Sequence, residues 1–130
     1  KEFSRLSGLD TAYILRNKLS AAKDFAEKYG VHILLKDAYS VYAAPDGFTA
    51  VNMSGNAALA KGGSGDVLSG IILSLLGQGL EPLAAAACGA YIHSRAGDLC
   101  ANDIGEFGMT PTDMLRYIPR VLKPLNSREW

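Results

Sequence analysis

The chain has 130 residues, of which 48% are hydrophobic and 20% are charged, a balance typical of a globular domain and not of a disordered or fibrous segment. Thirteen lysines and arginines match thirteen aspartates and glutamates, so the totals provide no long-range attraction to nucleic acid or to an anionic membrane. No segment has the roughly 18 to 20 consecutive apolar residues of a membrane span, and the polar start of the chain is unlike a signal peptide. We therefore expect a cytoplasmic protein that binds neither nucleic acid nor membranes.

The start of the sequence predicts a helix followed by a strand. From Asp10 to Tyr29 the apolar residues recur at helical spacing, with Asp10 as the N-cap and Gly30 as the stop. Val31–Leu35 is apolar apart from His32, which is typical of a strand covered on both faces. Such strands belong to parallel sheets, so we expect a mostly parallel sheet.

A β-hairpin and a loop are predicted next. Tyr39–Ala44 and Phe48–Asn52 are strand-like, and Pro45-Asp46-Gly47 separates them with turn chemistry, because proline presets φ and glycine supplies a positive φ. Residues 53–65 have no periodicity and are rich in Gly, Ser, Asn and Ala. We expect them to form a loop that leads directly into a helix.

Three helices are predicted in the second half of the chain. Apolar pairs four residues apart predict a buried helix over Asp66–Gln78. The alanine-rich stretch from Pro82 to about Asn102 predicts a helix that packs closely on a neighbour. A last helix, capped by Thr110, is expected to end near Leu122 and to precede a frayed tail. The order of these elements predicts an α/β fold with flanking helices.

The glycine-rich turn before the first of these helices has the composition of an anion-binding site. Gly62, Gly63 and Gly65 lack the side chains that would keep a phosphate away, and successive backbone N–H groups of Gly62–Gly65, including that of Ser64, can turn toward one point. The helix that follows adds unsatisfied N–H groups and the positive end of its dipole. We therefore expect an anion hole for a phosphoryl group at Gly62–Gly65.

Asp66 is the unusual member of this turn, because a carboxylate beside a phosphate site is repelled unless it has a task. It could accept a proton from a substrate hydroxyl while the oxygen attacks a nucleotide phosphate, which is typically worth roughly 10² to 10⁴ in rate. The alternative is that Asp66 only caps its helix. Spacing alone leaves both interpretations open, because the turn does not have the Walker pattern.

The residues around Asp66 resemble a known signature. Residues 62–72, Gly-Gly-Ser-Gly-Asp-Val-Leu-Ser-Gly-Ile-Ile, are similar to the motif of the ribokinase-like superfamily, in which Gly-x-Gly-Asp forms the anion hole and supplies the base. More closely, the chain resembles the ADP-dependent NAD(P)H-hydrate dehydratases, which repair damaged nicotinamide cofactors, over nearly its whole length. The further matching positions are Asn52, Gly55-Asn56, Leu59-Ala60, Gly79-Leu80, Ala85-Ala86, Tyr91-Ile92-His93 and Ala96-Gly97-Asp98.

The resemblance implies a reaction. In it ADP phosphorylates the 6-hydroxyl of hydrated NADH or NADPH, and loss of phosphate restores the dihydronicotinamide and leaves AMP. Asp66 would be the base and would contact the hydrated NAD(P)H. Mg²⁺ is expected because phosphoryl transfer needs its charge neutralised, although the sequence identifies no metal ligands. A homo-oligomer is also expected.

The resemblance also implies a nucleotide-binding segment. Leu35–Ser40 corresponds to the strand end that holds the adenine nucleotide, and Gly65 contacts the nucleotide beside it. The expected contacts in the segment are Lys36, Asp37, Ala38, Tyr39 and Ser40. Asp37 stands where the family frequently has glycine, and for Lys36 the alternative is a solvated strand end.

Other polar residues are expected to be structural. His93 and Asp98 are five residues apart on one helix, which turns them away from a shared face, so His93 is expected to be a hydrogen-bonded helix residue. Cys88 and Cys100 are too few for a disulfide framework and are expected to be buried free thiols. Glu106–Thr110 resembles the loop that leads into the family's last helix.

The resemblance also bears on domain organisation. Glu2–Leu6 is similar to the residues that come after a Thr-Pro-His stretch in the middle of the family's domain. We therefore expect residues 1–130 to form one partial domain, the C-terminal, nucleotide-side half of a ribokinase-like three-layer domain. Two alternatives for function remain: a related small-molecule kinase that uses ATP on a vitamin precursor or sugar, and a catalytically silent nucleotide-binding module.

Overall fold

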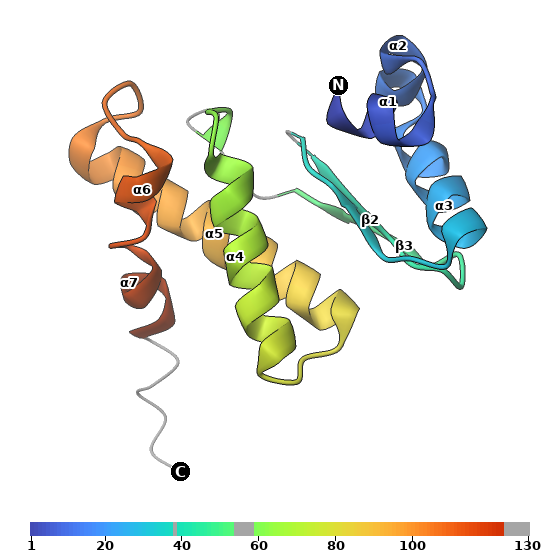
Figure 1. The fold of residues 1–130 in the computed structure, drawn as a ribbon. Coiled ribbons are helices and arrows are strands. Elements are labelled where there is room, and N and C mark those ends of the chain that lie inside the picture. The colour runs from blue at the N-terminus through green and yellow to red at the C-terminus, as the bar shows by residue number, and fades with distance from the viewer. Residues whose placement is uncertain (38, 54–58, 124–130) are drawn as a thin grey trace. The chain divides into compact units, whose positions relative to one another are not determined.

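A computed structural model describes residues 1–37, 39–53 and 59–123 of the chain. The chain has mixed helices and strands and divides into two compact units, Lys1–Met53 and Ser54–Trp130 (Figure 1). Ala38, the Gly55-Asn56 match and the tail beyond residue 123 lie outside the described residues. Among the described helices, none combines the length and the apolar character that crossing a bilayer requires.

The first unit consists of three helices and a small sheet. The helices are α1 (Glu2–Ser7), α2 (Thr11–Arg16) and α3 (Lys18–Tyr29), and the strands are β1 (Ile33–Leu35), β2 (Ser40–Ala43) and β3 (Thr49–Asn52). Helix α3 packs on β1 and β2 (Figure 1). Its small buried residues Ala22 and Ala26 contact Val41 and Ala43, and the half-buried Ile33 and Leu35 complete this core. The predicted mixture of helices and strands is confirmed, whereas α1 has no counterpart in the sequence prediction.

The sheet in the described residues is antiparallel, so the expectation of a parallel sheet from Val31–Leu35 is wrong for these strands. The strand order is β1-β2-β3, and both neighbouring pairs run antiparallel, with Leu35 opposite Val41 and Ser40 opposite Asn52. Only residues 36–39 join β1 to β2, whereas a parallel pair needs a crossover of about a dozen residues or more. The residues of β1 are half-buried and not covered on both faces.

The predicted hairpin is confirmed. Ala44 N–H donates to Phe48 O at 2.9 Å, and Gly47 N–H donates to Ala44 O at 3.0 Å, which closes the turn. Gly47 has φ 87°, a left-handed conformation that glycine adopts without steric cost. Gly47 therefore acts as its position in the turn indicates.

The helix predicted over Asp10–Tyr29 is interrupted at Asn17, which has φ −128° and ψ 38°. The Asn17 side chain donates to Tyr13 O at 3.1 Å, a local bond by which asparagine competes with helical backbone pairing. The predicted ends are confirmed, since the Asp10 carboxylate accepts from Ala12 N and Tyr13 N, and Gly30 ends α3 with φ 64°.

The second unit is helical. It consists of α4 (Ser64–Gly77), α5 (Pro82–Ile104), α6 (Pro111–Met114) and α7 (Ile118–Leu122). Helix α4 crosses α5 (Figure 1) and approaches it closely at Gly89, where an added Cβ would lie 2.5 Å from Ile72 Cγ1. The predicted close packing of the alanine-rich helix is confirmed.

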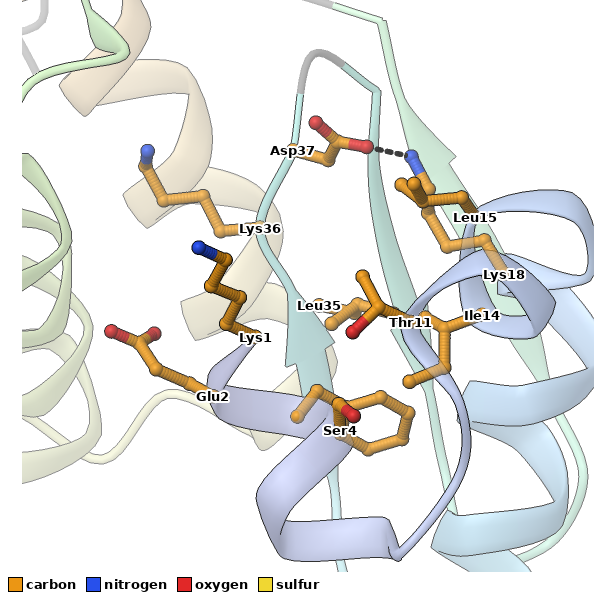
Figure 2. A pocket seen from close by; sticks show the side chains of 11 residues that line it. Lys1, Glu2, Ser4, Thr11, Ile14, Leu15, Lys18, Leu35, Lys36 and Asp37 are labelled. Carbon is orange, nitrogen blue, oxygen red and sulfur yellow. Dashed lines mark hydrogen bonds and ion pairs between the residues drawn. The ribbon is translucent and has the colours of Figure 1, made fainter.

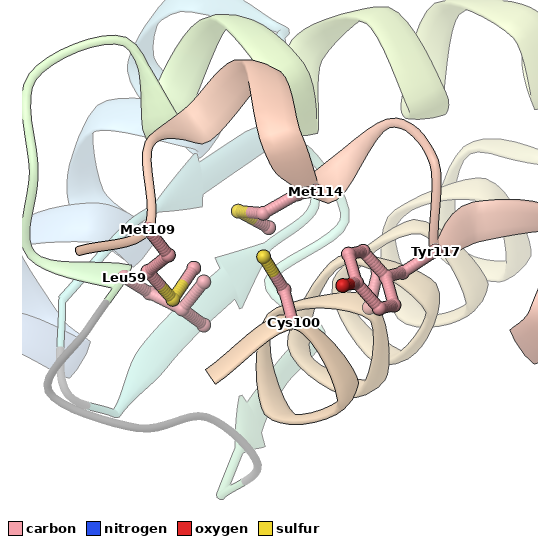
Figure 3. Packing of buried hydrophobic residues seen from close by; sticks show 6 residues of the cluster. Leu59, Cys100, Met109, Met114 and Tyr117 are labelled. Atoms are coloured by element: carbon pink, nitrogen blue, oxygen red, sulfur yellow. The ribbon is translucent and has the colours of Figure 1, made fainter. Parts of the chain in front are cut away.

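The core of this unit lies between α5 and the C-terminal segments. Its buried residues are Leu59, Ala96, Cys100, Met109, Met114 and Tyr117 (Figure 3). Burial, assisted by the negative charges of Asp113 and Asp103, raises the pKa of the Cys100 thiol. Cys100 is the buried free thiol that was expected, but Cys88 is exposed, because it lies on the outer face of α5.

The expectation that the helix of Asp66–Gln78 is buried is wrong in this chain. Ser64 and Leu68 are its buried residues, whereas Leu73 is 70% exposed. One stripe of α4 covers α5, and the apolar residues are distributed more widely around the helix than that stripe. Helix α4 also begins at Ser64, two residues earlier than expected.

The predicted last helix is two short helices. The Thr110 hydroxyl accepts from Asp113 N–H and begins α6 as expected, while the Asp113 carboxylate accepts from Thr110 N–H to complete a capping box. Residues 115–117 separate the two helices, and Pro119, near the start of α7, lacks the N–H group that would pair with the carbonyl four residues earlier. Tyr117 lies in the break, where its hydroxyl donates to Asp103 Oδ2 at 2.6 Å, a bond that raises the pKa of the phenol.

Candidate active site

The glycine turn is the start of α4. Gly63 is the N-cap, with φ 88° and ψ −14°, and Ser64 and Gly65 precede Asp66 in the first turn of the helix. Asp66 N–H and Val67 N–H both donate to Gly63 O, at 3.1 and 3.3 Å. Because a left-handed φ at Gly63 is strained for any residue with a side chain, glycine is what allows the chain to enter the helix here.

Asp66 does not cap this helix. The N-cap is Gly63, and α4 has no side-chain hydrogen bond at its cap. Asp66 lies three positions further on and is exposed to solvent. Its carboxylate is therefore located near the positive end of the helix dipole and is accessible to a ligand.

The backbone beside Asp66 is open. Gly62, Gly63 and Gly65 are exposed, and an added Cβ at Gly62 or Gly65 would meet no atom within 4 Å. The underside of Gly63 is covered by Pro111, since an added Cβ there would lie 3.6 Å from Pro111 Cγ. An anion could therefore approach this turn from its solvent side, at the N-terminus of a 14-residue helix.

The Ser64 side chain is directed into the unit, away from this open side. Ser64 is 1% exposed, and its hydroxyl lies 3.1 Å from His93 Nε2, while its carbonyl oxygen lies 2.9 Å from the same nitrogen. The expected hydrogen-bonded state of His93 on its helix is confirmed. Its partner in the glycine turn is not predicted from the sequence, because 29 residues separate the two.

The sequence analysis did not predict the hydrogen bonds that Lys61 makes. Its ammonium group donates to the carbonyl oxygens of Glu106, Phe107 and Met109, at 2.7, 3.2 and 2.7 Å. Its own carbonyl oxygen accepts from Ser64 N–H at 3.2 Å. A lysine directly before a glycine-rich turn was the available signal, although nothing in the sequence pairs it with a loop 45 residues away.

The expected nucleotide segment belongs to the first unit. Lys36 and Asp37 follow β1, and the Asp37 carboxylate forms an ion pair with Lys18 of α3 (Figure 2). The Ser40 hydroxyl, which is buried, lies 3.4 Å from Asp37 N and 3.3 Å from Asp37 O, whereas Tyr39 is exposed. Asp37, at the position where the family frequently has glycine, is therefore held by partners on both sides.

A pocket of about 210 Å³ adjoins this segment within the first unit. Figure 2 shows Lys36 and Asp37 at one end of it and Leu35 and Thr11 along its wall. Lys1 and Lys18 also line it, so two further cationic side chains are near the proposed nucleotide contacts. Glu2 and Asp37 line the same pocket, and Lys18 is paired with Asp37, so the acidic side chains offset most of this positive charge.

The remaining polar candidates have hydrogen-bond partners within the second unit. Asp98 Oδ2 accepts from Arg95 Nη1 at 3.3 Å on the exposed face of α5, and His93 bonds Ser64. Within residues 1–37, 39–53 and 59–123, no group of three or more His, Cys, Asp and Glu residues could hold a metal ion.

Comparisons with known proteins agree with the resemblance of the sequence motifs. The Carb_kinase family, described as NAD(P)H-hydrate dehydratase, matches residues 1–120. The chain is 45% identical over 126 residues to the bifunctional NAD(P)H-hydrate repair enzyme Nnr of Moorella thermoacetica. This alignment covers 97% of this chain and 24% of that protein. It is 40% identical over 104 residues to the ADP-dependent (S)-NAD(P)H-hydrate dehydratase of Neisseria meningitidis, covering 80% of this chain and 35% of the relative.

Solved structures show the same fold. An ADP/ATP-dependent NAD(P)H-hydrate dehydratase from Bacillus subtilis, co-crystallized with ATP and Mg²⁺, has a TM-score of 0.88 at 32% identity and covers 95% of this chain and 46% of that chain. A ribokinase-like superfamily protein from Enterococcus faecalis has a TM-score of 0.76 at 31% identity, over 95% of this chain and 41% of that one. The chain thus spans about a quarter of the first of these curated relatives and about half of the Bacillus structure. With a family match over residues 1–120, the chain belongs to the NAD(P)H-hydrate dehydratase family.

Proposed function

We propose that the complete protein carrying this chain catalyses the ADP-dependent dehydration of hydrated NADH and NADPH, and that Asp66 is its catalytic base. The observation that carries the proposal is the start of α4, where an exposed carboxylate that does not cap the helix stands beside an open glycine turn. The names of the Moorella and Neisseria relatives support the choice of substrate.

The reaction needs one base and one phosphate site. Asp66 would accept the proton of the 6-hydroxyl as its oxygen attacks the β-phosphorus of ADP, and AMP would leave with the bridging oxygen. Cleavage of the C6–O bond of the phosphorylated hydroxyl then releases inorganic phosphate, and loss of a ring proton forms the double bond of the dihydronicotinamide. Backbone N–H groups of Gly62–Gly65 and the dipole of α4 would stabilise the negative charge on the transferred phosphoryl group.

The nucleotide would be held by the end of β1. We assign the contacts to Lys36, Asp37, Ala38, Tyr39 and Ser40, with Gly65 from the glycine turn. The pocket that adjoins this segment supports a ligand-binding role for it. Mg²⁺ would neutralise phosphate charge, and a site with few protein ligands suits it because Mg²⁺ commonly binds through one or two carboxylates plus substrate phosphates and water.

The same comparisons support a proposal about the domain. We assign the chain to the nucleotide-side part of a larger ribokinase-like domain, because it covers 46% of the Bacillus structure at a TM-score of 0.88. Other parts of such a domain would complete the pocket for the hydrated nicotinamide. The cytoplasmic location and the homo-oligomer predicted from the sequence remain predictions.

The direct test is recovery of the reduced cofactor. The complete protein is incubated with hydrated NADH, ADP and Mg²⁺, and the absorbance of the dihydronicotinamide band is followed. We expect the absorbance to rise with release of equal amounts of AMP and phosphate. A flat trace from folded protein that binds ADP would overturn the proposal, and consumption of ATP with an added alcohol but no recovery of absorbance would favour the related kinases.

A further inference from the structure

The segment before the glycine turn and the loop before α6 are joined by a single side chain. The Lys61 ammonium donates to three carbonyl oxygens, those of Glu106, Phe107 and Met109, at 2.7, 3.2 and 2.7 Å. A lysine has three N–H donors, so this loop satisfies all of them. Bonds from a charged donor are also stronger than those between neutral groups.

Besides Lys61, a backbone hydrogen bond closes the loop, since Met109 N–H donates to Gly105 O at 3.2 Å. Glu106, Phe107 and Gly108 are exposed, and Phe107 has its whole side chain in solvent. Met109 is 2% exposed and anchors the far end of the loop in the core. The three carbonyl dipoles converge on one point, where without a cation they would repel one another.

The same loop supports the glycine turn. Directly after Met109 come Thr110 and Pro111, and the Pro111 ring covers the underside of Gly63. At the other end, Lys61 O accepts from Ser64 N–H at 3.2 Å. Lys61, the loop, Pro111 and Gly63 therefore form a closed ring of contacts, and the first turn of α4 with Asp66 continues from it.

We propose that Lys61 is a positioning residue for catalysis: its ammonium group gathers the carbonyl groups of residues 106–109 and thereby fixes the glycine turn that carries Asp66. The inference rests on the proposed function of Asp66 as the base. Lys61 itself touches no reacting atom, since its three donors are occupied by the protein.

The first test is Lys61→Met in the complete protein. Methionine keeps much of the length of the side chain and removes the cation. We expect kcat to fall on the order of 10- to 100-fold, because a displacement of about 1 Å at a reacting group can cost about 10²-fold. KM for ADP should change far less than kcat. The matched control is Lys123→Met, which removes an equal charge from an exposed position of the same unit and should leave kcat unchanged.

Chemical rescue separates positioning from folding. Lys61→Ala leaves space for a small amine, so propylammonium should raise its kcat in a dose-dependent way. Neither Lys61→Met, whose side chain fills that space, nor Asp66→Asn should respond. If Lys61→Met does not fold, Lys61→Arg keeps the charge with its donors in one plane, and we expect a smaller loss of kcat.

Amide hydrogen exchange at residues 62–66 gives a readout that does not depend on the reaction. Exchange there should be faster in Lys61→Met and Lys61→Ala than in the parent and in Lys123→Met. Parent-like kcat in Lys61→Met overturns the inference, and so does a folded Lys61→Ala whose kcat does not respond to propylammonium. If the parent protein is inactive, the proposed function is overturned, and hydrogen exchange alone tests the inference about Lys61. Exchange at residues 62–66 that is equal in the parent and in Lys61→Met would then overturn that inference.

Discussion

His93 and Ser64 form a buried link between α5 and the first residue of α4. His93 Nε2 lies 2.9 Å from Ser64 O and 3.1 Å from Ser64 Oγ, and the two residues are 3% and 1% exposed. A carbonyl oxygen can only accept, so Nε2 carries a proton in this contact. The glycine turn is therefore fastened from inside the unit by the imidazole and from the loop side by Lys61.

Replacement of His93 should lower the free energy of unfolding, and the loss should be larger when the new side chain has no hydrogen-bond donor. His93→Leu leaves the buried carbonyl oxygen of Ser64 without this donor, and we expect a loss of about 1 to 3 kcal/mol in the free energy of unfolding. His93→Gln can place an amide N–H near the same point and should lose less. Urea unfolding of both variants provides the comparison, and equal stabilities would contradict a contribution from the Nε2 hydrogen bond.

Asp66→Asn should separate binding from catalysis. Asparagine keeps the size of the side chain but cannot accept the proton, so we expect turnover in the complete protein to fall by roughly 10² to 10⁴. Affinity for ADP, measured by calorimetry, should persist because the backbone N–H groups of the turn are unchanged. Parent-like turnover would remove Asp66 from the mechanism.

The parts of the fold that could be predicted are those with a local cause. Asp10, Gly30, Gly47 and Thr110 each set a turn or a helix end through their own side chain or φ, and the structure has all four as predicted. The expectation of parallel pairing failed for the described strands because an apolar run such as Val31–Leu35 does not specify its partner strand. The short link of residues 36–39 decides the pairing.

In the candidate site, too, the residues that are adjacent in sequence could be predicted and the distant contacts could not. The glycines and Asp66 are adjacent in sequence, so the motif places them together at the start of α4. The groups that hold this turn come from 29 to 48 residues away, as His93 does for Ser64 and Met109 for Lys61. Their pairing is a property of helix packing, and no local pattern in one sequence encodes it.

Asp113 should give the chain an acid-sensitive contact. The Thr110 hydroxyl and then the Thr110 N–H group donate to its carboxylate, at 2.7 and 2.8 Å, and hold the pKa of Asp113 below its ordinary value of 3.8. A depressed pKa in the folded state contributes stability above the unfolded pKa, and this stability is lost as the pH falls through the folded value.

The window for Asp113 therefore lies at and below about pH 4. Thr110→Val removes the hydroxyl donor, so the NMR titration midpoint of the Asp113 carboxyl should rise toward 3.8. The advantage of the parent over Asp113→Asn should be constant near neutral pH and should shrink below that window. An unchanged midpoint in Thr110→Val would contradict the capping-box explanation.

Substitution of glycine by alanine should have opposite effects on the free energy of unfolding at two helical positions, Gly70 and Gly89. In a helix, alanine is favoured over glycine by about 1 kcal/mol. At Gly70 of α4 an added Cβ meets no atom within 4 Å, so Gly70→Ala should raise the free energy of unfolding by about 0.4 to 1 kcal/mol. At Gly89 of α5 the added Cβ would lie 2.5 Å from Ile72 Cγ1 and 3.6 Å from Ile72 Cα.

Relief of that clash at Gly89 requires Ile72 to change rotamer or α4 to move away from α5. Overpacking of this kind costs about 1 to 3 kcal/mol, which equals or exceeds the gain in helix propensity. Gly89→Ala should therefore be less stable than Gly70→Ala in urea unfolding, with an equal m-value if both variants fold to the same structure. Since α4 carries Asp66, a shift of this helix should also lower turnover in Gly89→Ala. A Gly89→Ala protein as stable as Gly70→Ala would show that the two helices are not held at the separation that the glycine permits.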